Sequence, residues 1–289
     1  MPTFLVTGNK LENIDLQLQA GKSQHAREQS LAIVFTHDGY SFCTAAGHPF
    51  VLSRLYAGLW PVNHAQMAPA EIMAWLQQTH PELKATYAKV NLAIDSRKNT
   101  LLPAAVYREG TGTDYFELVF GRIENEQLHR DSLPDLQMEM ISALPIGMAV
   151  AASQHFQNLR LFAADAAMFQ RLGRDWQEDE PLSLLLRLAH DQLSAWMYKG
   201  KQLQSYNQYY VADANDVLYY ANLLSEQQQL VIQLCGGSWL YEESLLILRN
   251  YFTEVQELKT EASSIAFDPQ WNDVAPHQLQ LLLATLCAS

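Results

Sequence analysis

Apolar positions along the chain fall into short runs separated by polar turns, and this pattern predicts strands. The first runs lie on either side of His37-Asp38-Gly39. An Asp-Gly pair between apolar runs favours a type I′ hairpin turn, in which both central residues have positive φ. We therefore expect three meandering strands early in the chain, over 31–36, over 40–46 and after Gly47.

A second meander is predicted in the later half of the chain. Its polar turns fall at Asp191-Gln192 and around Gly200. The two meanders have the same layout, with an apolar strand, a polar His-Asp turn, a second apolar strand and a glycine turn. The expected strands cover 181–189, 193–198 and 202–210.

The two meanders align without a gap at an offset of 153 positions, from Ser30 to Ser183. Six of the 18 positions in this alignment are identical, and they include the His-Asp pair of each turn. The identical pairs are Ser30/Ser183, Leu31/Leu184, His37/His190, Asp38/Asp191, Ser41/Ser194 and Gly47/Gly200. Because the offset is one domain length, the repeat predicts two lobes of common architecture.

The remaining chain predicts helices and further strands. Apolar positions at helical spacing predict helices over 69–78, 115–120, 147–157, 213–224, 241–258 and 277–287. Asp213 is expected to cap the fourth of these helices, because a carboxylate there accepts bonds from free backbone N–H groups. Short apolar or alternating runs predict strands over 87–94, 100–106, 136–144, 159–163 and 230–234.

The domain organisation follows from the acidic, proline-ended stretch 174–181, which is typical of a linker. We predict an N-terminal arm over 1–29, a first lobe over 30–174 and a second lobe over 181–289. Three meandering strands followed by helix, strand and helix is the order of a ribonuclease-H-like unit. The predicted fold is therefore α/β, with duplicated ribonuclease-H-like lobes in the architecture of actin, Hsp70 and hexokinase-like proteins.

Composition narrows the function classes. The 289 residues are 48% apolar and 17% charged, which is typical of a globular protein. The net charge of −12 and the lack of a Lys/Arg run argue against nucleic-acid binding, which depends on phosphate neutralisation. Apolar stretches are shorter than the roughly 20 residues that span a bilayer, and no signal peptide is indicated. We expect a cytoplasmic protein with reduced thiols at Cys43, Cys235 and Cys287.

Short motifs spread over most of the chain resemble a known family. They comprise Leu31, Ile33, Phe35, Asp38, Gly39, Ser41 and Phe42, then Thr100 to Pro103, then Asn207, Asp213, Leu218-Tyr219-Tyr220, Leu234 and Gly236. With them the chain resembles an uncharacterised bacterial family of unknown function that occurs mainly in Bacteroidetes. The resemblance covers Leu31 to the C-terminus and implies a fold similar to actin-like ATPases. It implies no activity, substrate or catalytic residue.

A nucleotide site in such a fold would lie between the lobes. A glycine turn lets backbone N–H groups approach phosphate oxygens, and carboxylates hold Mg²⁺. The candidate nucleotide-binding residues are Asp38, Gly39 and Ser41 in the first turn, Asp191 and Ser194 in the second, and Gly236 and Gly237 before the fifth predicted helix.

Both turns depart from the residues that phosphate binding requires. His37 stands where an Asp-x-Gly motif would place its acid, and Gln192 stands where a glycine is expected. A side chain at that second position would crowd the approach of a phosphate. Apolar and aromatic residues replace the usual Gly, Ser and Thr that follow: Tyr40, Phe42, Leu193 and Trp196. We therefore predict a degenerate site with no catalytic residue and no metal.

Two other groups of side chains have alternative interpretations. If His37 and His190 faced each other across the cleft, they could bind a metal or sense pH. The alternative, which we favour, is that they are two separate histidines on surface turns. Five aromatic residues on the second meander fit sheet packing, or a partner surface if several are exposed together. They are Trp196, Tyr198, Tyr206, Tyr209 and Tyr210.

The function we predict is that of a non-catalytic binding or scaffolding component with a protein partner and no cofactor. We favour the absence of enzymatic activity. The alternative is a functional ATPase or small-molecule kinase that uses Mg-ATP in the inter-lobe cleft. A third class, a pilus- or division-type assembly adaptor recruited to a membrane by a partner, follows by analogy with other actin-like proteins.

Overall fold

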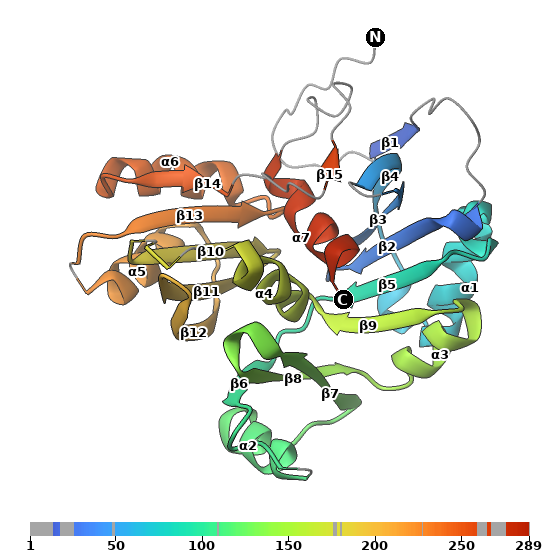
Figure 1. The fold of residues 1–289 in the computed structure, drawn as a ribbon, viewed down its shortest axis with the longest axis horizontal. Helices are drawn as coiled ribbons and strands as arrows, with labels where there is room; N and C mark the ends of the chain where they lie inside the picture. The colour runs from blue at the N-terminus through green and yellow to red at the C-terminus, as the bar shows by residue number, and fades with distance from the viewer. Residues whose placement is uncertain are drawn as a thin grey trace.

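The computed structural model contains two larger sheets and one small sheet, with helices packed on them (Figure 1). It describes residues 14–17, 26–47, 50–108, 110–175, 178–179, 181–226, 228–258, 265–266 and 276–288. Most of the predicted N-terminal arm lies outside these residues, and the predicted lobe boundaries stay predictions. No helix in the part of the chain described has the length and apolar character needed to cross a membrane.

The first sheet has seven strands and contains the first predicted meander. Its strands are β1 (Ile14–Gln17), β2 (Gln29–Phe35), β3 (Gly39–Ala46), β4 (Phe50–Leu59), β5 (Lys89–Ile94), β9 (Leu159–Ala163) and β15 (Ile265–Ala266). They lie in the order β1-β4-β3-β2-β5-β9, with β15 beside β4. Strands β2, β3 and β4 are antiparallel neighbours, whereas β5 is parallel to β2 and β9 is parallel to β5.

The second sheet has five strands in the corresponding order. Its strands are β10 (Ser183–Ala189), β11 (Gln192–Lys199), β12 (Gln202–Tyr210), β13 (Val231–Gly236) and β14 (Val255–Glu257). The order β12-β11-β10-β13-β14 repeats the order β4-β3-β2-β5-β9, with the same parallel and antiparallel pairings. The two predicted meanders and the common architecture of the lobes are therefore confirmed.

Seven α-helices connect the strands in the described residues. They are α1 (Pro69–Thr79), α2 (Thr111–Phe120), α3 (Met148–His155), α4 (Ala164–Asp175), α5 (Ala214–Ser225), α6 (Tyr241–Tyr251) and α7 (Pro276–Cys287). Short 3₁₀ turns cover Ala26–Glu28, His64–Gln66, Pro81–Lys84 and Pro134–Leu136. Helices α1 and α5 occupy equivalent places, each between the last meander strand and the following parallel strand. Asp213 caps α5 as predicted, because its carboxylate accepts bonds from the Asn215 and Asp216 amides.

The first lobe carries an insertion that the second lobe lacks. Residues 95–147 separate β5 from α3, whereas only 237–240 separate β13 from α6. The insertion forms α2 and a three-stranded sheet in the order β6-β8-β7, and it lies at the lower end of the molecule (Figure 1). Its strands are β6 (Asn99–Pro103), β7 (Glu126–Leu133) and β8 (Met138–Pro145).

Three of our sequence predictions are wrong in detail. The β2–β3 turn is not of type I′, because neither Asp38 nor Gly39 has positive φ. The turn is closed instead by Thr36, whose amide donates to the Gly39 carbonyl at 2.9 Å. Helix α6 ends at Tyr251, and the residues predicted to continue it form β14 beside β13. Strand β7 and helix α4 were not predicted.

The cores of the two lobes are built from the inward faces of the meanders. Trp196 and Tyr198 are fully buried, which confirms core packing for these aromatics, whereas Tyr210 is 67% exposed. Helix α7 lies between the two larger sheets (Figure 1) and packs against β2 and α4. The Asn91 amide on β5 donates to the Thr285 and Ala288 carbonyls at 2.7 and 2.9 Å. The end of the chain therefore covers the first sheet.

Candidate functional site

The turns of the two meanders meet in the space between the lobes. The imidazoles of His37 and His190 lie 4.7 Å apart between ring centroids, with the ring planes inclined by 57°. His190 has a φ of 52°, in the left-handed region. Our expectation that the two histidines are separate is therefore wrong, although His37 is exposed. The turns that would hold phosphates in a working nucleotide site are in direct contact.

The first turn uses its polar groups locally. The Thr36 hydroxyl donates to the Asp38 carboxylate at 2.9 Å. A Cβ added at Gly39 would lie 2.5 Å from the carbonyl oxygen of Gly58 on β4, so this glycine is required by the close approach of two strands. Ser41 lies within β3, opposite Val34 and Ala57.

The second turn is linked to the first lobe by an ion pair. The Arg97 guanidinium donates to both carboxylate oxygens of Asp191, at 2.9 and 3.1 Å. Gln192 is buried and begins β11. The buried Ser194 hydroxyl donates to the Asp165 carboxylate at 2.8 Å. Both candidate polar residues of this turn therefore have partners within the protein.

The later glycine pair lies beside the second turn. The Ser238 hydroxyl, next to this pair, donates to the His190 carbonyl at 2.7 Å. Gly236 has a φ of 122°, and a Cβ there would overlap the Leu188 carbonyl on β10. A Cβ at Gly237 would meet no atom within 4 Å. Packing between strands accounts for the first glycine and not for the second.

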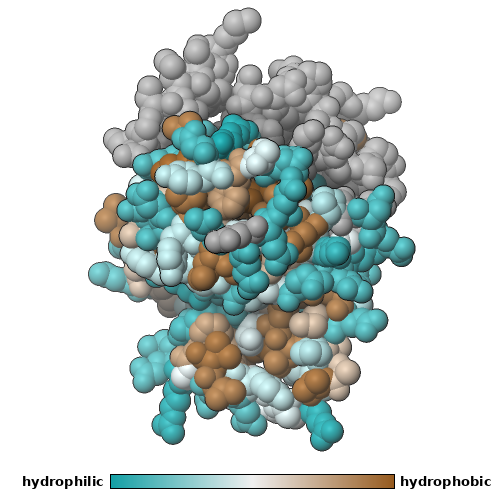
Figure 2. Space-filling view, turned by 90° about the vertical axis from the view of Figure 1, so that its left-hand side faces the viewer, coloured by the Kyte–Doolittle hydropathy of each residue, from teal (hydrophilic) through white to brown (hydrophobic). Residues whose placement is uncertain are grey.

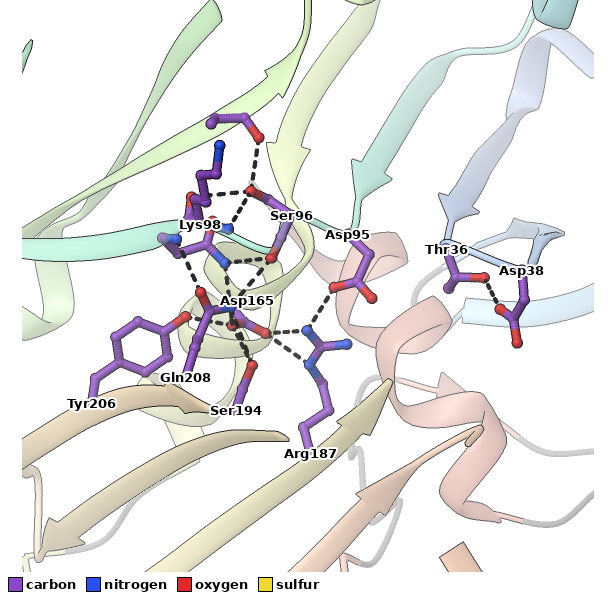
Figure 3. A network of polar contacts seen from close by, with 12 residues as sticks. Thr36, Asp38, Asp95, Ser96, Lys98, Asp165, Arg187, Ser194, Tyr206 and Gln208 are labelled. Carbon is purple, nitrogen blue, oxygen red and sulfur yellow. Dashed lines mark hydrogen bonds and ion pairs between the residues drawn. The ribbon is translucent and has the colours of Figure 1, made fainter. Parts of the chain in front are cut away.

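A buried network of charged groups joins the lobes beside this contact (Figure 3). Arg187 on β10 donates from Nε to Asp165 Oδ1 at 2.7 Å and from Nη2 to Asp95 Oδ1 at 2.7 Å. The three side chains are almost fully buried, at 3% exposure for Arg187, 0% for Asp165 and 8% for Asp95. Asp95 follows β5 and Asp165 lies in the first turn of α4, so one cation on the second lobe pairs with two carboxylates of the first.

Asp165 is the centre of the network because it accepts from several donors. The Tyr206 hydroxyl lies 2.5 Å from its Oδ2 atom, and the Gln208 amide lies 3.2 Å from the same atom. Burial, reinforced by the charge of the Asp165 carboxylate, raises the pKa of Tyr206 well above its ordinary value. Burial also raises the pKa of Asp95, and the nearby Arg187 opposes that shift. The network thus holds buried charges through partners within the protein.

A cavity of about 280 Å³ adjoins the network. Its walls come from the first sheet, from the small sheet of the insertion and from the β10–β11 turn. Phe35, Trp60 and Ile94 form its apolar part, and Arg97 and Asp191 form part of its polar rim. The Trp60 indole donates to the Thr36 carbonyl at 2.8 Å, which fixes one wall of the cavity.

The charged residues of the network, Asp95, Asp165 and Arg187, were not among the sequence candidates. Arg187 is the only charged residue in the run Ser183 to Ala189, and Asp165 stands in an alanine-rich segment. A lone charge within an apolar run is a signal of a buried ion pair, because charged side chains are rarely buried without one. In the described residues, no group of three or more His, Cys, Asp or Glu side chains is placed to hold a metal ion.

Comparisons with known proteins are consistent with the resemblance found in the sequence. The family described as "Protein of unknown function (DUF3822)" matches residues 19–255. No curated protein matches the chain. A Bacteroides thetaiotaomicron protein with an actin-like ATPase fold and unknown function has a TM-score of 0.76 at 15% identity, over 91% of this chain and 97% of that one.

A second solved structure with the same fold is that of the PilM-PilN type IV pilus biogenesis complex. It has a TM-score of 0.66 at 12% identity, over 90% of this chain and 98% of that one. At these identities the likeness concerns the fold alone. The predicted actin-like fold is confirmed, as is the resemblance to a family of unknown function.

Proposed function

We propose, from the premise that this chain belongs to the family described as protein of unknown function (DUF3822), that it is a non-catalytic protein-binding component with an actin-like fold. The inter-lobe region in this proposal is a structural junction and not a nucleotide site. The cytoplasmic location expected from the sequence stays a prediction.

The observation that carries the proposal is the position of Arg187 between Asp95 and Asp165. Mg²⁺ in a phosphoryl-transfer site is held by carboxylate oxygens and by the phosphates of the nucleotide. Here the buried carboxylates already have a cation of the protein's own as their partner. Arginine keeps its proton under ordinary conditions, so a fixed positive charge lies beside both carboxylates and would repel a metal ion there.

The contact between His37 and His190 supports the same conclusion. In a working site the two turns would lie on either side of the phosphates, with backbone N–H groups directed at them. Ring centroids 4.7 Å apart leave no room for a phosphate between these imidazoles. The residues present therefore do not fit Mg-ATP, and we derive no catalytic step from them.

A protein-binding role is supported by the likeness to PilM, whose structure is that of a complex with PilN. That complex is an example of a protein of this fold that associates with another protein. The lack of a Lys/Arg run and the net charge of −12 also favour a protein partner over nucleic acid.

Titration with Mg-ATP and Mg-ADP tests the proposal. A ligand present at 100 times its Kd stabilises a protein by about 2.7 kcal/mol, which thermal unfolding detects readily. We expect no shift of the unfolding midpoint at millimolar nucleotide and no ATP turnover. A shift that disappears in Asp38→Ala or Asp191→Ala would establish the alternative, a functional ATPase or small-molecule kinase.

A further inference from the structure

The insertion in the first lobe presents one helix, α2, to solvent at the end of the molecule. Figure 2 shows hydrophobic side chains gathered at the lower end, where Figure 1 places α2. The other large apolar side chains exposed in the described residues lie on several separate elements. The surface of α2 is therefore distinct from the inter-lobe junction.

Three exposed apolar side chains on α2 are neighbours on one face. Leu118 is 82% exposed, Val119 is 60% exposed and Tyr115 is 38% exposed. Residues three and four apart on a helix are neighbours on its surface, so the Tyr115 side chain lies next to those of Leu118 and Val119. A contiguous apolar patch of this kind is typical of an interaction surface, whereas single exposed apolar residues are ordinary.

A row of carboxylates runs beside the apolar face. Asp114 and Glu117 are both exposed and stand three positions apart, immediately before Tyr115 and Leu118. Helix α2 contains no Lys, Arg or His. Two carboxylates beside an apolar patch favour a partner with Lys or Arg next to its own apolar residues. They disfavour a second copy of α2, because the two acidic rows would face each other.

Helix α2 is packed against the rest of the insertion through its inner face, and a packed helix loses less conformational freedom on binding than an unfolded segment. Phe116 on its inner face is fully buried, and its ring lies 4.8 Å from that of Phe120. Gly112 is in close contact with Tyr107, since a Cβ there would lie 3.1 Å from the tyrosine ring. The exposed face thus does not need to be ordered by its partner.

We propose that the outer face of α2, formed by Asp114, Tyr115, Glu117, Leu118 and Val119, binds a basic amphipathic helix of a partner protein. The inference deepens the proposed function and rests on it, since it identifies the surface that receives the partner. Apolar side chains of the partner would cover Leu118 and Val119. Its Lys or Arg side chains would pair with Asp114 and Glu117.

The test uses the full chain and two synthetic helical peptides of about 18 residues, or five turns. One peptide has Leu on one face and Lys on the other, and the second has Glu in place of Lys. Fluorescence anisotropy at physiological salt measures their binding. We expect the Lys peptide to bind and the Glu peptide to bind at least tenfold more weakly. We expect Leu118→Gln to weaken binding of the Lys peptide at least tenfold.

The matched control is Leu246→Gln on α6, whose side chain is 64% exposed and lies outside the proposed surface. It should leave binding unchanged. The double variant Asp114→Lys/Glu117→Lys should reverse the preference, so that the Glu peptide binds more tightly. Because all these side chains are exposed, the variants should fold as the wild type does, and circular dichroism checks this.

Equal losses in the Leu118 and Leu246 variants would overturn the proposal, as would no binding by the wild type or equal binding of both peptides. A wild-type dimer in light scattering that Leu118→Gln dissociates would also overturn it, because the occupant would then be a second copy. These failures differ from a failure of the proposed function. Nucleotide binding would refute the latter in a separate titration and would leave the peptide result unchanged.

Discussion

Replacement of Arg187 by Met would remove the cation that pairs with both Asp95 and Asp165. Removing one partner of a buried ion pair costs about 3–5 kcal/mol, because the remaining charge is buried without compensation. The pair of Arg187 and Asp165 is a buried ion pair of this kind, because the Arg187 side chain is 3% exposed and that of Asp165 is 0% exposed. Tyr206 and Gln208 still donate to Asp165 in the variant, and these bonds limit the loss.

Urea and thermal unfolding of Arg187→Met measure the effect. At about 2–4 °C per kcal/mol, the unfolding midpoint should fall by about 6–20 °C. The matched control is Arg249→Met, whose exposed pair with Glu257 at 3.6 Å should contribute about 0–1 kcal/mol. A loss in Arg187→Met no larger than that of the control would refute the reasoning.

The pH dependence of the same variant provides a second check. A carboxyl group with a pKa raised on folding destabilises the native state once pH exceeds its ordinary value, 3.8 for Asp95. Without Arg187, which opposes the shift, the pKa of Asp95 should rise further. The difference in unfolding free energy between variant and wild type should therefore be larger at pH 8 than at pH 5. Further replacement of both Asp residues by Asn should recover most of the loss.

Three more predictions concern the turns and a helix cap. Gly236→Ala should cost about 2–4 kcal/mol, because its Cβ would overlap the Leu188 carbonyl and its φ is positive, while Gly237→Ala should stay within about 0.5 kcal/mol. Burial lowers the pKa of His37 from 6.5, so the unfolding free energy of the wild type should fall as pH drops below about 6.5. The fall should be smaller in His37→Gln. Urea unfolding at pH 7.5 and at pH 5.5 measures both. Asp213→Ala should cost about 1 kcal/mol in urea unfolding through loss of the α5 cap, and no change would contradict the capping role.

Sequence patterns predicted most of the local structure. Strand β9 was predicted over 159–163 and observed over Leu159–Ala163, and α1 was predicted over 69–78 and observed over Pro69–Thr79. Both elements carry apolar residues at the spacing of their buried faces. Strand β7 was missed because it is an edge strand rich in polar residues, with the sequence EQLHRDSL. Strand β14 was missed because pairing with β13 outweighs a local pattern that continues the helix.

The candidate site was likewise predicted in part. The sequence located both turns and the glycine pair, since turn residues are a local signal. It gave no account of their contacts. His37 was expected to be separate from His190 and contacts it, and Ser194, a candidate nucleotide-binding residue, donates to Asp165. The residues that define the junction come from strands and helices where a local pattern indicates burial but not a partner.

What the sequence determined by itself was the repeated plan of the two lobes, because apolar runs and the polar turns between them are local features of the chain. Only the tertiary structure determined which charged side chains between the lobes pair with one another. Arg187 reaches Asp95 and Asp165 across 92 and 22 positions of the chain. Electrostatic pairing depends on separations of a few ångströms between such distant residues, and these separations exist only after the lobes have packed together.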